Sequence, residues 1–368
     1  MKKLFLTALG ALLAVSVQAQ TVTKLAATKA NDYGIAYSLP RTVIDIDLEA
    51  ECTVRTPGEF YNYAERYLGT EAARKAVGKP STSWRLTKAV LTPRGEIADG
   101  AEQWLMQFKA GAPVFVALDA QGVPVAISAE PDAAEAAAPA VPASADMSKS
   151  PLETAAARYA VTEEMVQGSS LAKRAQLAAD QIMQLRQSRQ DYLTGQADVM
   201  PDGKALELIL NNINAQEEAL TAMFLGTVQT RTASTRAVYV PADGDAADVV
   251  IARINALSGF VGADDLSGAP VYLQMKVADR GRLPKTEKGE PKAFPKNGVP
   301  YCIPGAAEFA VEFDGRKVAG ARFNVAQLGV VFGLNPALFS SKKEPGYAIF
   351  DPVTGGLKEL GTLNETAD

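Results

Sequence analysis

The chain has 368 residues, 47% of them hydrophobic and 21% charged, and a formal net charge of −5. This length and composition predict two or three domains with full hydrophobic cores. Nucleic acid and anionic membranes are disfavoured as partners, because either would select a concentrated basic face. No histidine is present, which excludes Ser-His-Asp and Cys-His catalysis, histidine general bases and most zinc sites. We therefore expect neither a cofactor nor a metal.

The first residues have the pattern of a secretory signal peptide. Lys2 and Lys3 precede an apolar run over residues 4–17, and Val17-Gln-Ala19 places small residues where a signal peptidase requires them. We expect residues 1–19 to be removed and the exported protein to be periplasmic or envelope-associated. No later apolar run has the length of a membrane span, so no span is expected.

Residues 20–128 are predicted to form a β domain with one short helix. From residue 43 to 54 apolar and acidic residues alternate, which is typical of a half-buried antiparallel strand with its acidic side in solvent. A helix is expected after Pro57, with Phe60, Tyr63 and Tyr67 on one face that packs on the adjacent sheet. Further strands are expected at residues 84–90, 103–108, 114–118 and 123–127.

Residues 129–149 are mostly Ala, Pro, Ser and acidic residues, a composition that predicts a flexible linker. The long helical segment follows, over residues 150–226. Ser150-Pro-Leu-Glu153 has the pattern of a capping box, which places a helix start there. That helix is expected to continue to Gly168.

Two longer helices are predicted after this first one. The second starts at Ser169 or Ser170 and ends at Gly195, and the third follows residue 203. Their apolar side chains recur at steps of three and four, which predicts a seam between two antiparallel helices, a helical hairpin. Arg189 interrupts one apolar series and Glu217 the other, and their spacing from the loop leaves open whether they pair.

Residues 227–368 are predicted to form a second β domain. Asp243, Asp245 and Asp248 superficially resemble a calcium loop, but the spacing lacks the EF-hand pattern, so we expect a turn without a metal. The predicted fold class is α+β, with two antiparallel β domains bracketing the helical hairpin. Strands are expected at residues 235–240, 249–257, 271–277, 299–303, 307–313, 318–325, 329–334 and 347–350.

A short phrase occurs in both β halves. Gly34-Ile-Ala-Tyr-Ser-Leu-Pro40 matches Gly298-Val-Pro-Tyr-Cys-Ile-Pro304 at glycine, tyrosine and proline. A shared entry strand of this kind favours duplicated, sandwich-like β units. Tyr37 and Tyr301 would then occupy equivalent places in the two cores.

The two cysteines, Cys52 and Cys302, would meet an oxidising compartment after export. A disulfide between them would require direct contact of the two β halves, with Cα atoms within about 7 Å. Two separate buried thiols are the alternative, and the sequence leaves both open.

Several stretches together resemble a known family. They are the phrase at 34–40 with its acidic strand, the helix at 57–68, the helical residues 191–195 with 202–208, and Phe350-Asp-Pro-Val-Thr-Gly355. These are similar to an uncharacterised exported family of Gram-negative anaerobes, catalogued as domain of unknown function 4831. The resemblance covers nearly the whole mature chain. It implies export and a single unit, and it implies no catalytic residue, cofactor or substrate.

Three classes of function remain open. A non-enzymatic envelope protein, acting as a scaffold or accessory subunit for a protein partner, fits the lack of histidine and of a nucleophile motif. A carbohydrate-binding module is the alternative, with Tyr61, Trp84 and Trp104 as contacts for a glycan, and it would require at least two rings on one face. A glycoside hydrolase would require two carboxyl groups about 5 to 9 Å apart in a cleft.

Overall fold

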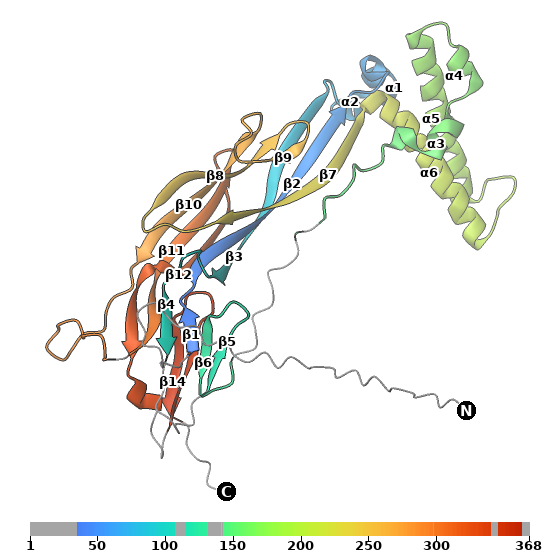
Figure 1. Ribbon diagram of the computed structural model, residues 1–368. Helices are drawn as coiled ribbons and strands as arrows, with labels where there is room; N and C mark the ends of the chain where they lie inside the picture. The colour runs from blue at the N-terminus through green and yellow to red at the C-terminus, as the bar shows by residue number, and fades with distance from the viewer. Residues whose placement is uncertain are drawn as a thin grey trace, which may run out of the picture.

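The protein consists of an elongated β body with helices gathered at one end (Figure 1). The computed structural model describes residues 35–106, 115–131, 141, 143–296, 298–339 and 345–362. The expected signal peptide, residues 1–19, lies outside these ranges. None of the described helices is long and apolar enough to cross a membrane.

The strands alternate with short helical stretches before residue 130 and follow a longer helical region after residue 226. The strands are β1 (Ile35–Ser38), β2 (Arg41–Thr56), β3 (Ser81–Glu96), β4 (Gln103–Met106), β5 (Val116–Leu118), β6 (Pro124–Ile127), β7 (Thr227–Tyr239), β8 (Ala246–Asn255), β9 (Gly259–Val261), β10 (Ala269–Asp279), β11 (Val299–Phe313), β12 (Arg316–Leu334), β13 (Gly346–Phe350) and β14 (Leu357–Thr362). The helices are α1 (Ala64–Leu68), α2 (Thr70–Ala73), α3 (Ala155–Ala160), α4 (Glu163–Gln167), α5 (Leu171–Thr194) and α6 (Gly203–Leu225), with 3-10 turns η1 (Tyr61–Tyr63), η2 (Pro151–Glu153) and η3 (Pro336–Phe339).

Two sheets form the long part of the body, with strand orders β3-β2-β7 and β12-β11-β10-β8-β9. Alternate side chains of each strand point to one face, because the side-chain period of a strand is two. Ile44, Ile46 and Leu48 of β2 lie in one buried cluster with Leu273 of β10 and Phe309 of β11. Side chains of both sheets therefore share one buried core.

Strands from before and after the helices belong to the same sheet. β2 pairs with β7 from Ile44 opposite Tyr239 to Thr56 opposite Thr227. The expected separate β domains, residues 20–128 and 227–368, are therefore not separate in the structure. The physical reason is that β2 and β3 alone would form a two-stranded ribbon, which is marginally stable in water.

A smaller core lies at the end of the body away from the helices (Figure 1). The sheets β1-β4 and β14-β13-β6-β5 surround it, and Tyr37, Ile127 and Phe350 are buried in it. Ile127 of β6 lies opposite Ala348 of β13. This second core also joins the two halves of the chain.

The two copies of the shared phrase meet in this smaller core. Tyr37 lies opposite Trp104 in the β1-β4 pair, whereas Tyr301 lies opposite Phe332 in the β11-β12 pair. The Tyr37 hydroxyl donates to the carbonyl oxygen of Pro300 at 3.0 Å, and burial raises its pKa. Two cores were expected, but both tyrosines pack in the same smaller core. Their neighbouring strands are not equivalent, since β1 pairs with β4 and β11 with β12. The phrase is therefore not the entry strand of two separate units.

The motif Phe350-Asp-Pro-Val-Thr-Gly355, here called the closing motif, forms the turn between β13 and β14. The Asp351 carboxylate accepts from the Val353 amide at 3.1 Å and from the Thr354 hydroxyl at 2.7 Å. The Cys302 amide donates to the Gly355 carbonyl oxygen at 2.9 Å. The motif thus attaches this turn to the first part of β11, which gives it a structural role.

The first two carboxylates on the acidic side of β2 are covered, although the alternating pattern predicted a solvated face. Asp45 and Asp47 are only 6% and 9% exposed. Arg94 of β3 donates to Asp45 at 3.1 Å, and Arg236 of β7 donates to Asp47 at 2.6 Å. Arginines from both neighbouring strands therefore neutralise and cover these carboxylates, which sequence alternation alone does not reveal.

The helical head is the unit formed by η1, α1 and α2 together with η2 and α3 to α6. Phe60 and Tyr67 pack on Phe224 of α6, with ring centroids 5.3 and 6.3 Å apart. The aromatic face of the short helix was expected to pack on the adjacent sheet, and that expectation is wrong. The chain leaves the body after β2 and returns at β3, and it enters the head again at η2 and returns at β7. Both insertions therefore meet beside the paired strand ends Thr56 and Thr227.

The predicted starts and stops of the helices follow side-chain caps. The hydroxyls of Ser150 and Ser170 accept amide hydrogens at helix starts, and Gly195 ends α5 in the left-handed region with φ of 75°. The expected continuous helix from Ser150 to Gly168 is instead divided into η2, α3 and α4. Thr154 and Thr162 cap the two later pieces, so each restarts the helix.

The expected linker, residues 129–149, lies partly outside the described residues, which omit 132–140 and 142. Its last part is not free: residues 144–148 are hydrogen-bonded to β7. Serine hydroxyls and backbone groups make these bonds, which composition alone does not predict.

Candidate functional site: a groove at the base of the helical head

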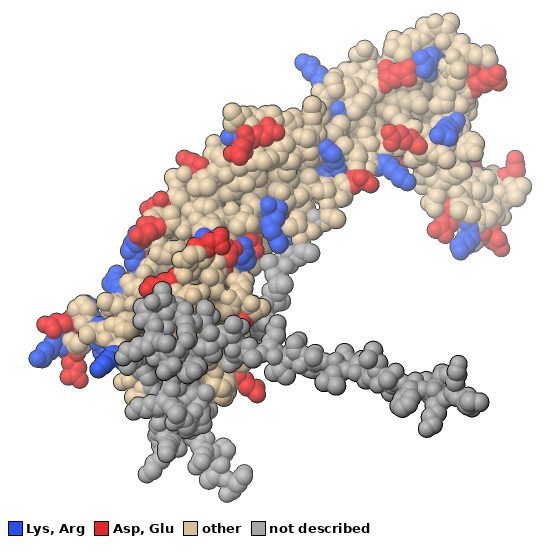
Figure 2. Space-filling model, in the orientation of Figure 1, with Lys and Arg blue, Asp and Glu red and all other residues tan. Residues whose placement is uncertain are grey.

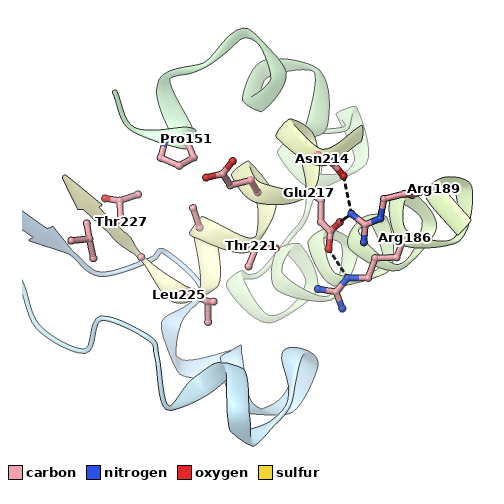
Figure 3. Close-up of a pocket in the computed structure, with 12 residues that line it drawn as sticks. Pro151, Arg186, Arg189, Asn214, Glu217, Thr221, Leu225 and Thr227 are labelled. Atoms are coloured by element: carbon pink, nitrogen blue, oxygen red, sulfur yellow. Dashed lines mark hydrogen bonds and ion pairs between the residues drawn. The ribbon is translucent and has the colours of Figure 1, made fainter. Parts of the chain in front are cut away.

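A groove of about 480 Å³ opens where the head joins the body. Figure 3 shows it between the turn that starts the helical region, α6 and the first residues of β7. Its walls come from α5, α6, η2 and β7. The residues that line it are Pro151, Arg186, Arg189, Asn214, Glu217, Glu218, Thr221, Ala222, Leu225, Gly226, Thr227 and Val228.

Two arginines of α5 share one carboxylate of α6 at one side of the groove (Figure 3). The Arg186 Nε donates to Glu217 Oε1 at 2.6 Å. The Arg189 Nη1 donates to Glu217 Oε2 and, at 3.0 Å, to Asn214 Oδ1. Glu217 is largely buried and both arginines are partly exposed. These three side chains together carry one excess positive charge.

The sequence left the pairing of Arg189 with Glu217 open, and the structure pairs them. Sequence reasoning missed Arg186 and Asn214. The signal was available, because Arg186 precedes Arg189 by three residues and Asn214 precedes Glu217 by three. Residues three apart lie on one face of a helix, so both pairs face the seam.

The rest of the groove is formed by small polar and apolar side chains. Thr221 and Leu225 come from α6, Thr227 and Val228 from β7, and Pro151 from η2. A ligand seated here would contact the head and the body together. Partly exposed guanidinium donors suit a carboxylate or a chain of backbone carbonyls, because arginine offers several N–H groups in a planar fork.

The three aromatic residues considered for glycan binding lie on three different elements, η1, β3 and β4. Tyr61 is 39% exposed on η1. Trp84 is half-buried, its indole N–H donates to the Ala256 carbonyl oxygen at 3.0 Å, and Arg231 covers its ring at 5.2 Å. Trp104 packs against the smaller core at the other end of β2. Each ring therefore has its own structural environment.

Both cysteines are buried as free thiols. Cys52 lies on β2 opposite Trp84, and Cys302 lies on β11 beside the closing turn. Burial, with a contribution from Asp351, raises the pKa of the Cys302 thiol to about 11. A thiol with this pKa is almost entirely protonated near neutral pH and reacts slowly.

The acidic loop before β8 uses its carboxylates within the fold. Asp245 accepts from the Val277 amide at 2.7 Å, and Asp243 pairs with Arg280. Within the part of the chain that the structure describes, no three Cys, Asp or Glu side chains form a group that could hold a metal ion.

Charged side chains are dispersed over the described part of the face that Figure 2 shows. On the face shown in Figure 2, basic and acidic residues are interspersed along the body and the head. No concentrated basic patch is visible among the described residues on that face. The arginine pair at the groove is therefore a local feature of the head.

The fold and the groove define an elongated antiparallel β protein with a helical head and a polar groove between the two. The chain belongs to the family described as Domain of unknown function (DUF4831), whose family model matches residues 33–358. A search of curated proteins and a search of solved structures each gave no match.

Proposed function

We propose that this protein is a non-enzymatic, exported envelope protein that acts as a scaffold or accessory subunit by binding a protein partner at its helical head. The observation that carries the proposal is the groove lined by both head and body. A partner segment seated there would hold the head in one orientation on the body. Its carboxylate or backbone carbonyls would accept from Arg186 and Arg189.

Two finer features of the architecture belong to this proposal. We infer that the body is a β-sandwich, since one buried cluster contains side chains of both large sheets. We infer that α5 and α6 form an antiparallel hairpin. Arg186 of α5 contacts Glu217 of α6, and Arg189, further along α5, contacts Asn214, which lies earlier on α6. A rigid hairpin of this kind presents a fixed surface to a partner.

Neither alternative function is favoured by a particular observation. A carbohydrate-binding module would require exposed rings on one face, and Trp84 and Trp104 are half-buried at different ends of the body. A glycoside hydrolase would require paired carboxyl groups in a cleft. The carboxylates that line the groove, Glu217 and Glu218, are adjacent on one helix, and Glu217 is held by two arginines.

Site-specific photocrosslinking in cells tests the proposal. A photoreactive residue at Glu218 or Thr221, two positions of α6 that line the groove, is expected to give the same discrete protein adduct. The control position is Asn212, which is exposed on α6 outside the groove. Adducts of equal yield from Asn212, or none from the groove positions, would contradict the proposal.

A second arm tests the arginine pair. Arg186→Gln is expected to reduce the adduct several-fold, because it removes a donor for the partner. Arg174→Gln on the same helix is the matched control. Arg174 forms an ion pair with Glu59 at an N–O distance of 2.8 Å, and neither residue lines the groove. Equal loss in both variants would show a general effect on the head.

A further inference from the structure

A short segment of the chain covers the free edge of β7. β7 is the outer strand of the sheet β3-β2-β7. Residues 144–148, here called the strap, lie along it: the Ala145 amide donates to the Thr232 carbonyl oxygen at 2.9 Å, and the Ser148 amide donates to the Thr230 carbonyl oxygen at 2.8 Å. Partner numbers fall as strap numbers rise, so the strap runs antiparallel to β7.

Two serine hydroxyls of the strap accept hydrogen bonds that backbone carbonyls would accept in a regular strand pair. The Thr230 amide donates to the Ser148 hydroxyl at 2.9 Å, and the Ser234 amide donates to the Ser144 hydroxyl at 3.1 Å. In a regular antiparallel pair these amides would donate to backbone carbonyls. The strap therefore satisfies the edge without forming a complete strand.

Little apolar surface holds the strap in place. Residues 143–149 are all exposed. Val228 and Val238 lie on β7 at either side of the covered stretch and are 54% and 55% exposed. A longer strand on this edge would extend past both valines, and two apolar side chains of that strand could cover them.

We propose that the edge of β7 is a strand-acceptor site, and that the strap occupies it until an extended segment of a partner protein displaces it. The incoming segment would add antiparallel to β7, as in other β-augmentation complexes. It would carry small polar residues at its centre and an apolar side chain toward each end, facing Val228 and Val238. Exchange is feasible because an unpaired strand edge is a template for another chain.

Removing the strap's backbone donors tests whether the edge can be opened. Ala145→Pro/Ser148→Pro deletes the two donated N–H groups and the Ser148 hydroxyl. The matched control is Asp146→Pro/Met147→Pro, whose amides make no hydrogen bond to β7. Amide hydrogen exchange at Thr230 and Ser234 is expected to be about tenfold faster in the first variant than in the control.

Binding in trans tests whether the opened edge accepts a strand. The probe is a synthetic peptide with the sequence of residues 141–150, added at millimolar concentration to the full-length variants. The peptide is expected to restore slow exchange at Thr230 and Ser234 in the strap-released variant and to leave the control unchanged.

Two outcomes would overturn the proposal. The first is unchanged exchange in the released variant, because the strap would then not protect the edge. The second is fast exchange that the peptide does not slow. If the proline variant loses its native circular dichroism spectrum, Ser144→Ala/Ser148→Ala gives the milder release, judged by the same two outcomes. The groove variants leave the strap intact, so the two proposals fail separately.

Discussion

At the scale of single residues, the attachment of the head depends on close backbone contact at Gly58. A Cβ atom at this position would lie 2.3 Å from the Met223 carbonyl oxygen, which accepts from the Phe60 amide at 2.7 Å. Gly58→Ala is expected to lower the free energy of unfolding by about 1 to 3 kcal/mol, because backbone must move. Chemical denaturation measures this loss. Gly244→Ala is the control, since a Cβ there meets nothing within 4 Å, and equal losses would refute the close contact.

At the scale of elements, cross-strand ion pairs attach β2 to its two neighbours. Asp47→Asn is expected to lower the free energy of unfolding by about 1 to 3 kcal/mol. The substitution removes the charge of a nearly buried carboxylate and leaves its partner, Arg236 of β7, without a counter-ion at that position. Glu51→Gln on the same strand should change it by less than about 1 kcal/mol, because its partner Arg85 is well exposed. Urea denaturation of both variants decides this, and an equal effect would show that burial of the pair is unimportant.

Long strands at this scale also differ from their sequence pattern. Residues 299–303 and 307–313 read as two strands, but they are one strand, β11, with a register shift between Ile303 and Gly305. Pro304 interrupts the alternation at this point. Between these two positions β11 advances two residues while its partner advances five, from Val330 to Val325, so the extra residues lie in β12 and the ladder resumes beyond them.

At the scale of the whole molecule, the two buried thiols report on opening of the fold. At pH 8 the Cys302 thiol, with its pKa of about 11, is ionised to about one part in a thousand. A thiol reagent is therefore expected to react slowly with the native protein. After denaturation without reductant, it is expected to react with two thiols per chain. Fewer than two thiols in the denatured protein would reveal a disulfide and contradict the separate burial of Cys52 and Cys302.

The sequence by itself determined the local features. Helix starts at Ser150 and Ser170 and the stop at Gly195 were predictable, because caps act through hydrogen bonds within a few residues. The strand at 43–54 was predictable from its alternation, and the family resemblance from contiguous motifs. Each of these signals is local, so one stretch of chain is sufficient to detect it.

Only the tertiary structure decided which stretches meet. β2 pairs with β7 across the whole helical region, Phe60 packs on Phe224, and the strap lies on β7. The groove was missed for the same reason, since it forms only where α5 and α6 meet η2 and the start of β7. Such contacts are selected by the burial of apolar faces and the pairing of strand edges, and both depend on every segment of the chain at once.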